Sequence, residues 1–464
     1  MEQKEKAPIE LGTESVGSLL LKYALPAIIA MTASSLLNNV DVFFISRFVG
    51  PEAISGLGAT MPFMMLGAAF GAMIGVGASS ILSIRFGQRD YKTAQQVLGN
   101  TISLNIILSL VVTAVFLIFL DPLLYLFGAS ENTLPYARPY MYIILGGSII
   151  THSYLGLNAV IRSAGHPLFS MWCTITMVLS NALLDWLFVW VWGMGIAGAA
   201  WATILSQSIG LIMELVVLSR KDEMVHLKRG IYRIKLKIVK QILLIGLSPF
   251  FMNVCACLVV LIINQSMRKY GDLEYGEHGG DYAIGAYSIV NRVVFFFLMV
   301  VMGINQGMQP IVGYNWGAHQ NDRVWRTLRY AITGGVLVTT TGWLIGECCP
   351  EFLTRIFSDG DSEGSQRILE ISTTGFRIDV LILPVVGAQM VITNFFQSIG
   401  HAGKSIFLSL TRQLLFLIPG LLILPKYIGL NGVWAALPVS DATSFIVTSS
   451  MLWWLIHKVR ATKK

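Results

Sequence analysis

Long apolar segments joined by short polar stretches dominate the hydropathy pattern of this chain. A helix needs about 20 apolar residues to cross the bilayer core. Segments of that length predict twelve membrane-spanning helices, the longest of them tilted or kinked. The predicted helices cover residues 18–46, 53–84, 94–119, 137–161, 168–192, 196–218, 238–266, 282–312, 325–347, 367–397, 404–424 and 429–456.

The composition also indicates a membrane environment. Hydrophobic residues make up 54% of the 464 residues and charged residues 13%, about half the usual share in soluble proteins. We therefore predict an all-α membrane protein rather than a set of soluble domains. The net charge of +7 does not indicate nucleic-acid binding, because no Lys/Arg patch carries interleaved aromatic residues. The five cysteines are odd in number and no His stands at metal-ligand spacing, so we expect no metal centre.

Basic residues are distributed unevenly between alternate loops. Of the 33 Lys and Arg residues, 22 fall in the termini and the loops on their side, seven in the opposite loops and four inside the spans. Loops rich in Lys and Arg stay in the cytoplasm. We therefore predict that both termini and the basic segment 219–240 are cytoplasmic. The opposite loops are acidic, as in GDLEYGEHGGD and SDGDSEG.

The two halves of the chain resemble each other at an offset of about 230 residues. Gly87 aligns with Gly317 at an offset of 230, and the sequences RSAGH and QSIGH align at 235. Six helices followed by six, both entered from the same side, form a parallel repeat typical of alternating-access transporters. We predict an amino-terminal lobe with helices 1–6, a basic linker that forms an interfacial amphipathic helix, and a carboxyl-terminal lobe with helices 7–12. Their limits are 1–218, 219–240 and 241–464.

Ionisable residues inside the predicted spans are candidate functional residues, because a charge inside the bilayer is costly. Glu214 and Glu347 lie near span ends, so we expect them to reach water. Arg412 and Asp441 are expected to be structural partners in the carboxyl-terminal lobe. The remaining candidates are Asp41, Asp185, Asp379, Arg292 and Arg377.

Four polar residues of the amino-terminal half are predicted to lie at one depth. Asp41 and Asp185 precede outer loops by six to eight residues and Thr203 follows one by ten, which places all three roughly 9–15 Å below those loops. Asn181 lies one turn before Asp185, on the same helix face. Two carboxylates in a low-dielectric pocket disfavour simultaneous ionisation, so the cluster would hold a proton or bind a cation. A buried structural network that does not titrate is the alternative.

Five segments carry most of the information about family: NNVDVFFISRFVG (38–50), SNALLDWLFV (180–189), GIAGAAWATILSQ (195–207), SLTRQLLFLIPGLLILP (409–425) and GLNGVWAALPVSDA (429–442). With these segments the chain resembles the multidrug and toxic compound extrusion (MATE) family along nearly its whole length. The family has the same plan of twelve spans in two lobes. In its prokaryotic members an Asp on the first helix, an N-x-x-x-D pair on the fifth and a Thr on the sixth carry proton or sodium coupling. The resemblance therefore implies coupling at Asp41, Asn181, Asp185 and Thr203.

The carboxyl-terminal half departs from one branch of that family. That branch keeps a carboxylate on the tenth helix about a dozen residues before an R-G-x-G turn. Here the turn reads QSIGHAG, and the corresponding stretch VVGAQM has no acid. The position opposite Asp41 in the second repeat is Asn264. We therefore expect the coupling site in the amino-terminal lobe only.

The function that the resemblance implies is cation-coupled export of amphipathic, often cationic, drugs by alternating access from the bacterial cytoplasmic (inner) membrane. The alternative is a lipid-linked-sugar flippase of the same broader superfamily. An enzyme is not expected, because no nucleophile–base or metal constellation is visible, and no G-x-x-x-x-G-K-[ST] motif indicates direct use of ATP. We expect a monomer that binds drug-like small molecules and membrane lipids. It would need no cofactor beyond the coupling proton, or a sodium ion held at the coupling residues.

Overall fold

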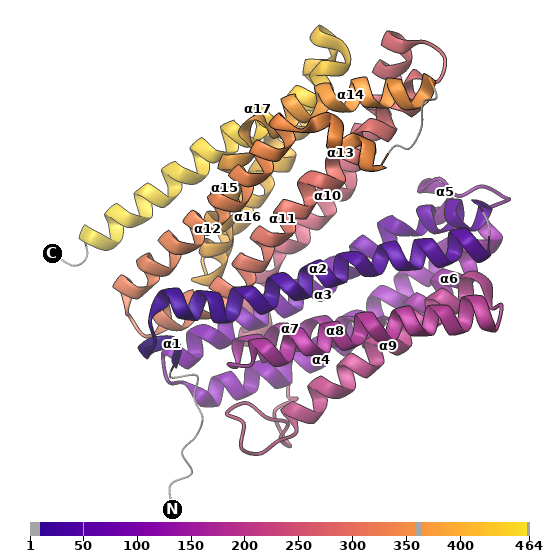
Figure 1. Ribbon diagram of the computed structural model, residues 1–464. Helices are drawn as coiled ribbons and strands as arrows, with labels where there is room; N and C mark the ends of the chain where they lie inside the picture. The colour runs from indigo at the N-terminus through magenta and orange to yellow at the C-terminus, as the bar shows by residue number, and fades with distance from the viewer. Residues whose placement is uncertain (1–9, 50, 358–362, 462–464) are drawn as a thin grey trace, which may run out of the picture.

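The computed structural model describes residues 10–49, 51–357 and 363–461, and these residues form helices and short turns without any strand (Figure 1). The first half contains α1 Glu10–Thr13, α2 Val16–Phe48, α3 Pro51–Gly87, α4 Tyr91–Ile118, α5 Leu120–Leu126, α6 Leu134–Gly146, α7 Ser148–Ser163, α8 Pro167–Asp185, the π-helix η1 Trp186–Val191 and α9 Gly195–Leu218. The second half contains α10 Leu236–Tyr275, α11 Gly279–Gly317, α12 Asn321–Cys348, α13 Pro350–Phe357, α14 Glu363–Asp379, the 3-10 helix η2 Val380–Ile382, α15 Leu383–Ser398, α16 Ala402–Leu410, the π-helix η3 Thr411–Leu417 and α17 Ile418–Ala461.

Twelve spans account for these helices, as predicted. Nine helical stretches in the described residues are long and apolar enough to cross a membrane, and the pair α6 and α7, bent by 54°, makes a tenth. The longest stretch, Ala402–Val459, contains two spans, because non-helical backbone at Ile428 and Gly429 interrupts α17. The more polar α12 packs against α11 and α15 and is the twelfth span.

The spans are arranged in two lobes, which Figure 1 shows in indigo to magenta and in salmon to yellow. α3 packs against α10 and α11, and α2 packs against α11. These contacts join the lobes at one end of the bundle, which we call the basic end and which carries the turns at 88–90, 164–166 and 318–320. At the opposite end the lobes diverge, with α5 and α6 on one side and α13 and α14 on the other (Figure 1).

Glycines allow the lobes to pack backbone against backbone near the basic end. A Cβ atom added at Gly77 of α3 would lie 2.1 Å from the carbonyl oxygen of Ile242 in α10. One added at Gly246 of α10 would lie 1.9 Å from the carbonyl oxygen of Met73 in α3. Small residues permit this approach between membrane helices. The contact between the lobes therefore depends on positions without a side chain.

The internal repeat is visible in the backbone. Residues with positive φ follow corresponding helices of the two halves, at the same offsets of 230 to 235 residues found in the sequence. Corresponding pairs are Arg89 (φ 58°) with His319 (φ 57°), Gly165 (φ 106°) with Gly400 (φ 78°), and Gly195 (φ 63°) with Gly429 (φ 60°).

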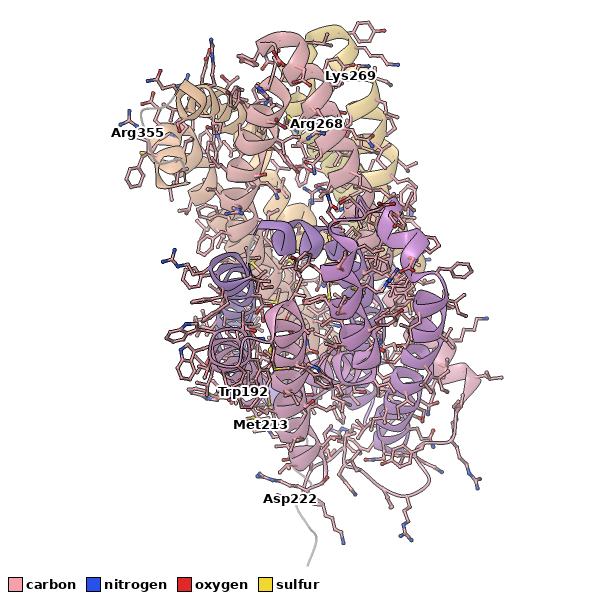
Figure 2. The ribbon with its side chains drawn as sticks, turned by 90° about the vertical axis from the view of Figure 1, so that its right-hand side faces the viewer. Trp192, Met213, Asp222, Arg268, Lys269 and Arg355 are labelled. Atoms are coloured by element: carbon pink, nitrogen blue, oxygen red, sulfur yellow. The ribbon has the colours of Figure 1, made fainter. Side chains whose placement is uncertain are left out.

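The segment 219–235 between the lobes is not helical, so the predicted amphipathic helix is wrong. Its backbone pairs with side chains of α4 instead. Gln95 accepts a hydrogen bond from the backbone N–H of His226 at 3.1 Å, and Asn100 accepts one from that of Lys235 at 2.8 Å. Figure 2 places Asp222 of this segment far from Arg268, Lys269 and Arg355. Residues 236–240, assigned to the linker from sequence, are the first residues of α10.

Candidate functional site

Three of the four predicted coupling residues meet in the amino-terminal lobe. Asp41 of α2 is 8% exposed, and Asn181 and Asp185 of α8 are fully buried. With its amide turned so that the NH₂ group faces the carboxylates, Asn181 donates to Asp41 Oδ1 at 2.9 Å and to Asp185 Oδ2 at 3.2 Å. One amide thus bridges two carboxylates from different helices, and Asn181 and Asp185 share a helix face as their spacing predicts.

Thr203 makes its hydrogen bond elsewhere. It lies on α9 and is 5% exposed, and its hydroxyl donates to the carbonyl oxygen of Ala199 in the same helix at 3.0 Å. Thr203 also lines the cavity described below. Thr203 is therefore part of the cavity wall, and its hydrogen bond is made within α9 rather than to the carboxylates.

The backbone next to Asp185 is irregular in a way that the sequence did not reveal. Asp185 is the last residue of α8, and the π-helix η1 begins directly after it. Short π-helical segments are often found at functional sites. Asp185 Oδ1 is buried and makes no hydrogen bond within the described part of the chain. A buried acceptor without a partner favours a proton or a cation, because it has lost its water.

A cavity of about 520 Å³ lies beside this cluster and reaches both lobes. Ser34 of α2 and Met177 of α8 line it, and Met177 is one helical turn from Asn181. Its volume falls within the range of small-molecule sites. Its apolar wall includes Met31, Phe63, Met64, Phe116, Met141, Ile144, Leu155 and Met302.

A second buried polar network lies closer to the basic end. Asn158 donates to Glu214 Oε1 at 3.0 Å, and Arg162 donates to Asn158 Oδ1 at 3.0 Å. A second guanidinium nitrogen of Arg162 donates to Gln306 of the other lobe. Glu214 is fully buried, so the prediction that it reaches water is wrong: α7 and α8 cover the last turns of α9.

The carboxyl-terminal lobe contains an ion pair. Arg412 lies in the π-helix η3, and its Nε atom is 2.6 Å from Oδ1 of Asp441. Ser440 donates to the carbonyl oxygen of Arg412 at 2.7 Å. This direct pairing agrees with the structural role expected for Arg412 and Asp441. Arg377 is exposed and Asp379 half-buried.

A model of the MatE family matches residues 26–187 and 248–422. The chain belongs to the MatE family. Among its relatives, the multidrug export protein MepA of Staphylococcus haemolyticus is 24% identical over 93% of this chain and 92% of its own length. MepA of Staphylococcus saprophyticus is 21% identical over 97% of this chain and 96% of its own length.

Solved structures share the fold of this MatE protein. One, described as the outward-facing conformation of a multidrug resistance MATE family transporter of the MOP superfamily, superimposes with a TM-score of 0.89. It is 23% identical and covers 99% of this chain and 100% of its own. The all-α fold of twelve helices in two lobes is thereby confirmed. The protein is a multi-pass membrane protein of a transporter family, not an enzyme.

Proposed function

We propose that this protein is a secondary antiporter that exports amphipathic organic molecules, driven by proton or sodium entry at Asp41, Asn181 and Asp185. The observation that carries the proposal is the buried pair of carboxylates bridged by one amide, with Asp185 Oδ1 unpaired in the described structure. Such a pair is costly while both groups are charged. A proton or a sodium ion bound there removes that cost.

Coupling follows from the position of the pair between two helices. Asp41 lies on α2, which packs against α11 of the other lobe, whereas Asp185 lies on α8. Neutralising the pair changes the interaction between α2 and α8 next to the cavity. An ion that binds one arrangement of the lobes better than the other shifts the equilibrium between them. Binding and release of the ion on opposite sides would then drive alternating access.

The cavity supports drug-like substrates. Methionine and phenylalanine side chains line much of it, and flexible thioethers adapt to ligands of different shape. The relatives are named multidrug export proteins. The resemblance also implies a preference for cationic drugs. The described residues that line the cavity include no carboxylate, so the cavity wall does not support that preference.

The orientation is part of the proposal. With the basic end in the cytoplasm, the lobes close the cytoplasmic side and the cavity opens outward. A single cysteine introduced at position 228, in a variant without native cysteines, should resist an impermeant thiol reagent added to intact cells. Ready labelling from outside would invert the orientation.

Transport measurements in proteoliposomes test the antiport. A pH gradient and a sodium gradient are imposed separately, and accumulation of a fluorescent drug is followed. We expect one gradient to drive transport and its collapse to stop it. If the rate of transport is the same with the pH gradient, with the sodium gradient, with both and with neither, coupling at this site is contradicted.

A further inference from the structure

Arg162 is the one permanently charged side chain among the described residues that line the cavity. It is the last but one residue of α7. His152 is the other lining residue whose side chain can carry positive charge, and Asp41 and Asp185 are not part of the wall. The wall therefore presents positive charge to a ligand, although the coupling site beside it is acidic.

The guanidinium of Arg162 is held in place but not saturated. It donates to Asn158 Oδ1 at 3.0 Å and to Oε1 of Gln306. A guanidinium has five N–H donors in a planar fork. In the part of the chain that the structure describes, three of these donors have no partner. A fixed, partly unsatisfied fork suits a planar carboxylate, which accepts two parallel hydrogen bonds.

The carboxyl group of this network lies behind Arg162 and is not part of the cavity wall. Glu214 is fully buried, and Asn158 separates it from Arg162 by donating to Glu214 Oε1 at 3.0 Å. Arg162 and Glu214 form no direct ion pair in the described structure, since the amide of Asn158 stands between them. Ser170 also donates to Asn158 Oδ1 at 2.7 Å and fixes this amide. The guanidinium of Arg162 thus lies at the cavity wall, whereas the carboxyl group of Glu214 lies in the protein interior.

We infer that Arg162 is an anion subsite of this cavity, so that among otherwise similar ligands those with a carboxylate bind, and are exported, preferentially. The carboxylate would bind the free N–H groups of Arg162, and the apolar body would contact the methionine and phenylalanine wall. Gln306 belongs to the other lobe, so a ligand at Arg162 would contact both lobes at once. The inference deepens the proposed export function and rests on it for the direction of transport only.

Equilibrium binding to the purified full-length protein in nanodiscs, without any ion gradient, tests the subsite. The probes are norfloxacin, which carries a carboxylate, and its methyl ester, which has the same ring system without that charge. We expect the wild type to bind norfloxacin at least about tenfold more tightly than the ester, equivalent to 1.4 kcal/mol. Arg162→Gln should bring this ratio close to one, and Arg162→Lys should keep it above one.

Two further variants distinguish loss of the anion subsite from general damage to the folded protein. Glu214→Gln keeps an acceptor for Asn158 behind Arg162, so norfloxacin should still bind more tightly than the ester. Arg292→Gln, on α11 and outside the described cavity wall, should keep the wild-type ratio. A ratio near one in the wild type, no measurable binding of norfloxacin, or an unchanged ratio in Arg162→Gln would overturn the subsite. Because no gradient is applied, these results are independent of whether export is ion-coupled.

Discussion

Replacing Gly77 by alanine tests how the lobes close the basic end. Gly77 lies in α3, and a Cβ atom there would approach the carbonyl oxygen of Ile242 in α10 to 2.1 Å. Ordinary contact begins at 3.4 Å, so the two helices must separate locally by about 1.3 Å. The obstacle is backbone, which cannot rotate away as a side chain can. The lobes themselves must therefore move.

The cost of this overpacking is about 1–3 kcal/mol. It applies only to the arrangement in which the basic end is closed, so the ratio of the two arrangements should shift by roughly 5- to 150-fold. Gly58→Ala is the matched control, because it lies in the same helix and its Cβ atom would meet nothing within 4 Å. Alanine is also the better helix former at both positions.

Distances between spin labels at the opposite end measure the shift. Labels at Glu131→Cys and Glu277→Cys, one in each lobe, report whether that end closes when the basic end opens. We expect Gly77→Ala to increase the short-distance population and Gly58→Ala to leave it at the wild-type level. Identical distributions in all three proteins would refute the reasoning that the glycine contact holds the lobes together.

Two further predictions concern stability. Arg412→Leu leaves the carboxylate of Asp441 without its partner, and Asp441→Asn leaves the guanidinium of Arg412 without its partner, so each should destabilise the protein by about 3 kcal/mol. The double variant should lose less stability than the sum of the two single variants. Additive falls in Tm would contradict the pairing. Hydrogen bonds from the hydroxyl and then the backbone N–H of Thr93 hold the pKa of Asp90, the N-cap of α4, below its ordinary value of 3.8. Asp90 therefore stabilises the fold above about pH 4 and loses this effect as the pH falls through its lowered pKa. Asp90→Ala should cost about 1 kcal/mol at pH 7, and a Tm difference from wild type that does not shrink below pH 4 would refute this assignment.

Most of the helices could be predicted from the sequence, because the length of an apolar segment reflects the thickness of the bilayer. The predicted span 53–84 corresponds to α3 at Pro51–Gly87, and the span 196–218 to α9 at Gly195–Leu218. The repeat was also predictable, since its glycines mark positive φ values that other residues rarely adopt. The prediction of a helix in the linker was wrong, because side chains of α4 bind the linker backbone. This interaction joins segments that are distant in the sequence.

The candidate site was predictable only in part. The spacing of Asn181 and Asp185 placed them on one face, and Asp41 was found from its depth. The hydrogen bond from Thr203 to Ala199 and the π-helix after Asp185 depend on local backbone geometry, which no sequence pattern indicates. Arg162, the last but one residue of α7, received no role from the sequence. Its role becomes visible only when α7, α9 and α11 are brought together.

Gradient-driven efflux by Asp41→Asn tests coupling most directly. The substitution keeps the shape of the side chain but fixes it in a neutral state, so the site can no longer exchange a proton or a cation. Efflux is measured in proteoliposomes and normalised to the amount of inserted protein, with Asp379→Asn of the other lobe as the control. The account predicts that Asp41→Asn inserts normally but shows no gradient-driven efflux, whereas Asp379→Asn retains most of it. Wild-type efflux by Asp41→Asn, with a well-inserted but inactive Asp379→Asn, would contradict a coupling site in the amino-terminal lobe.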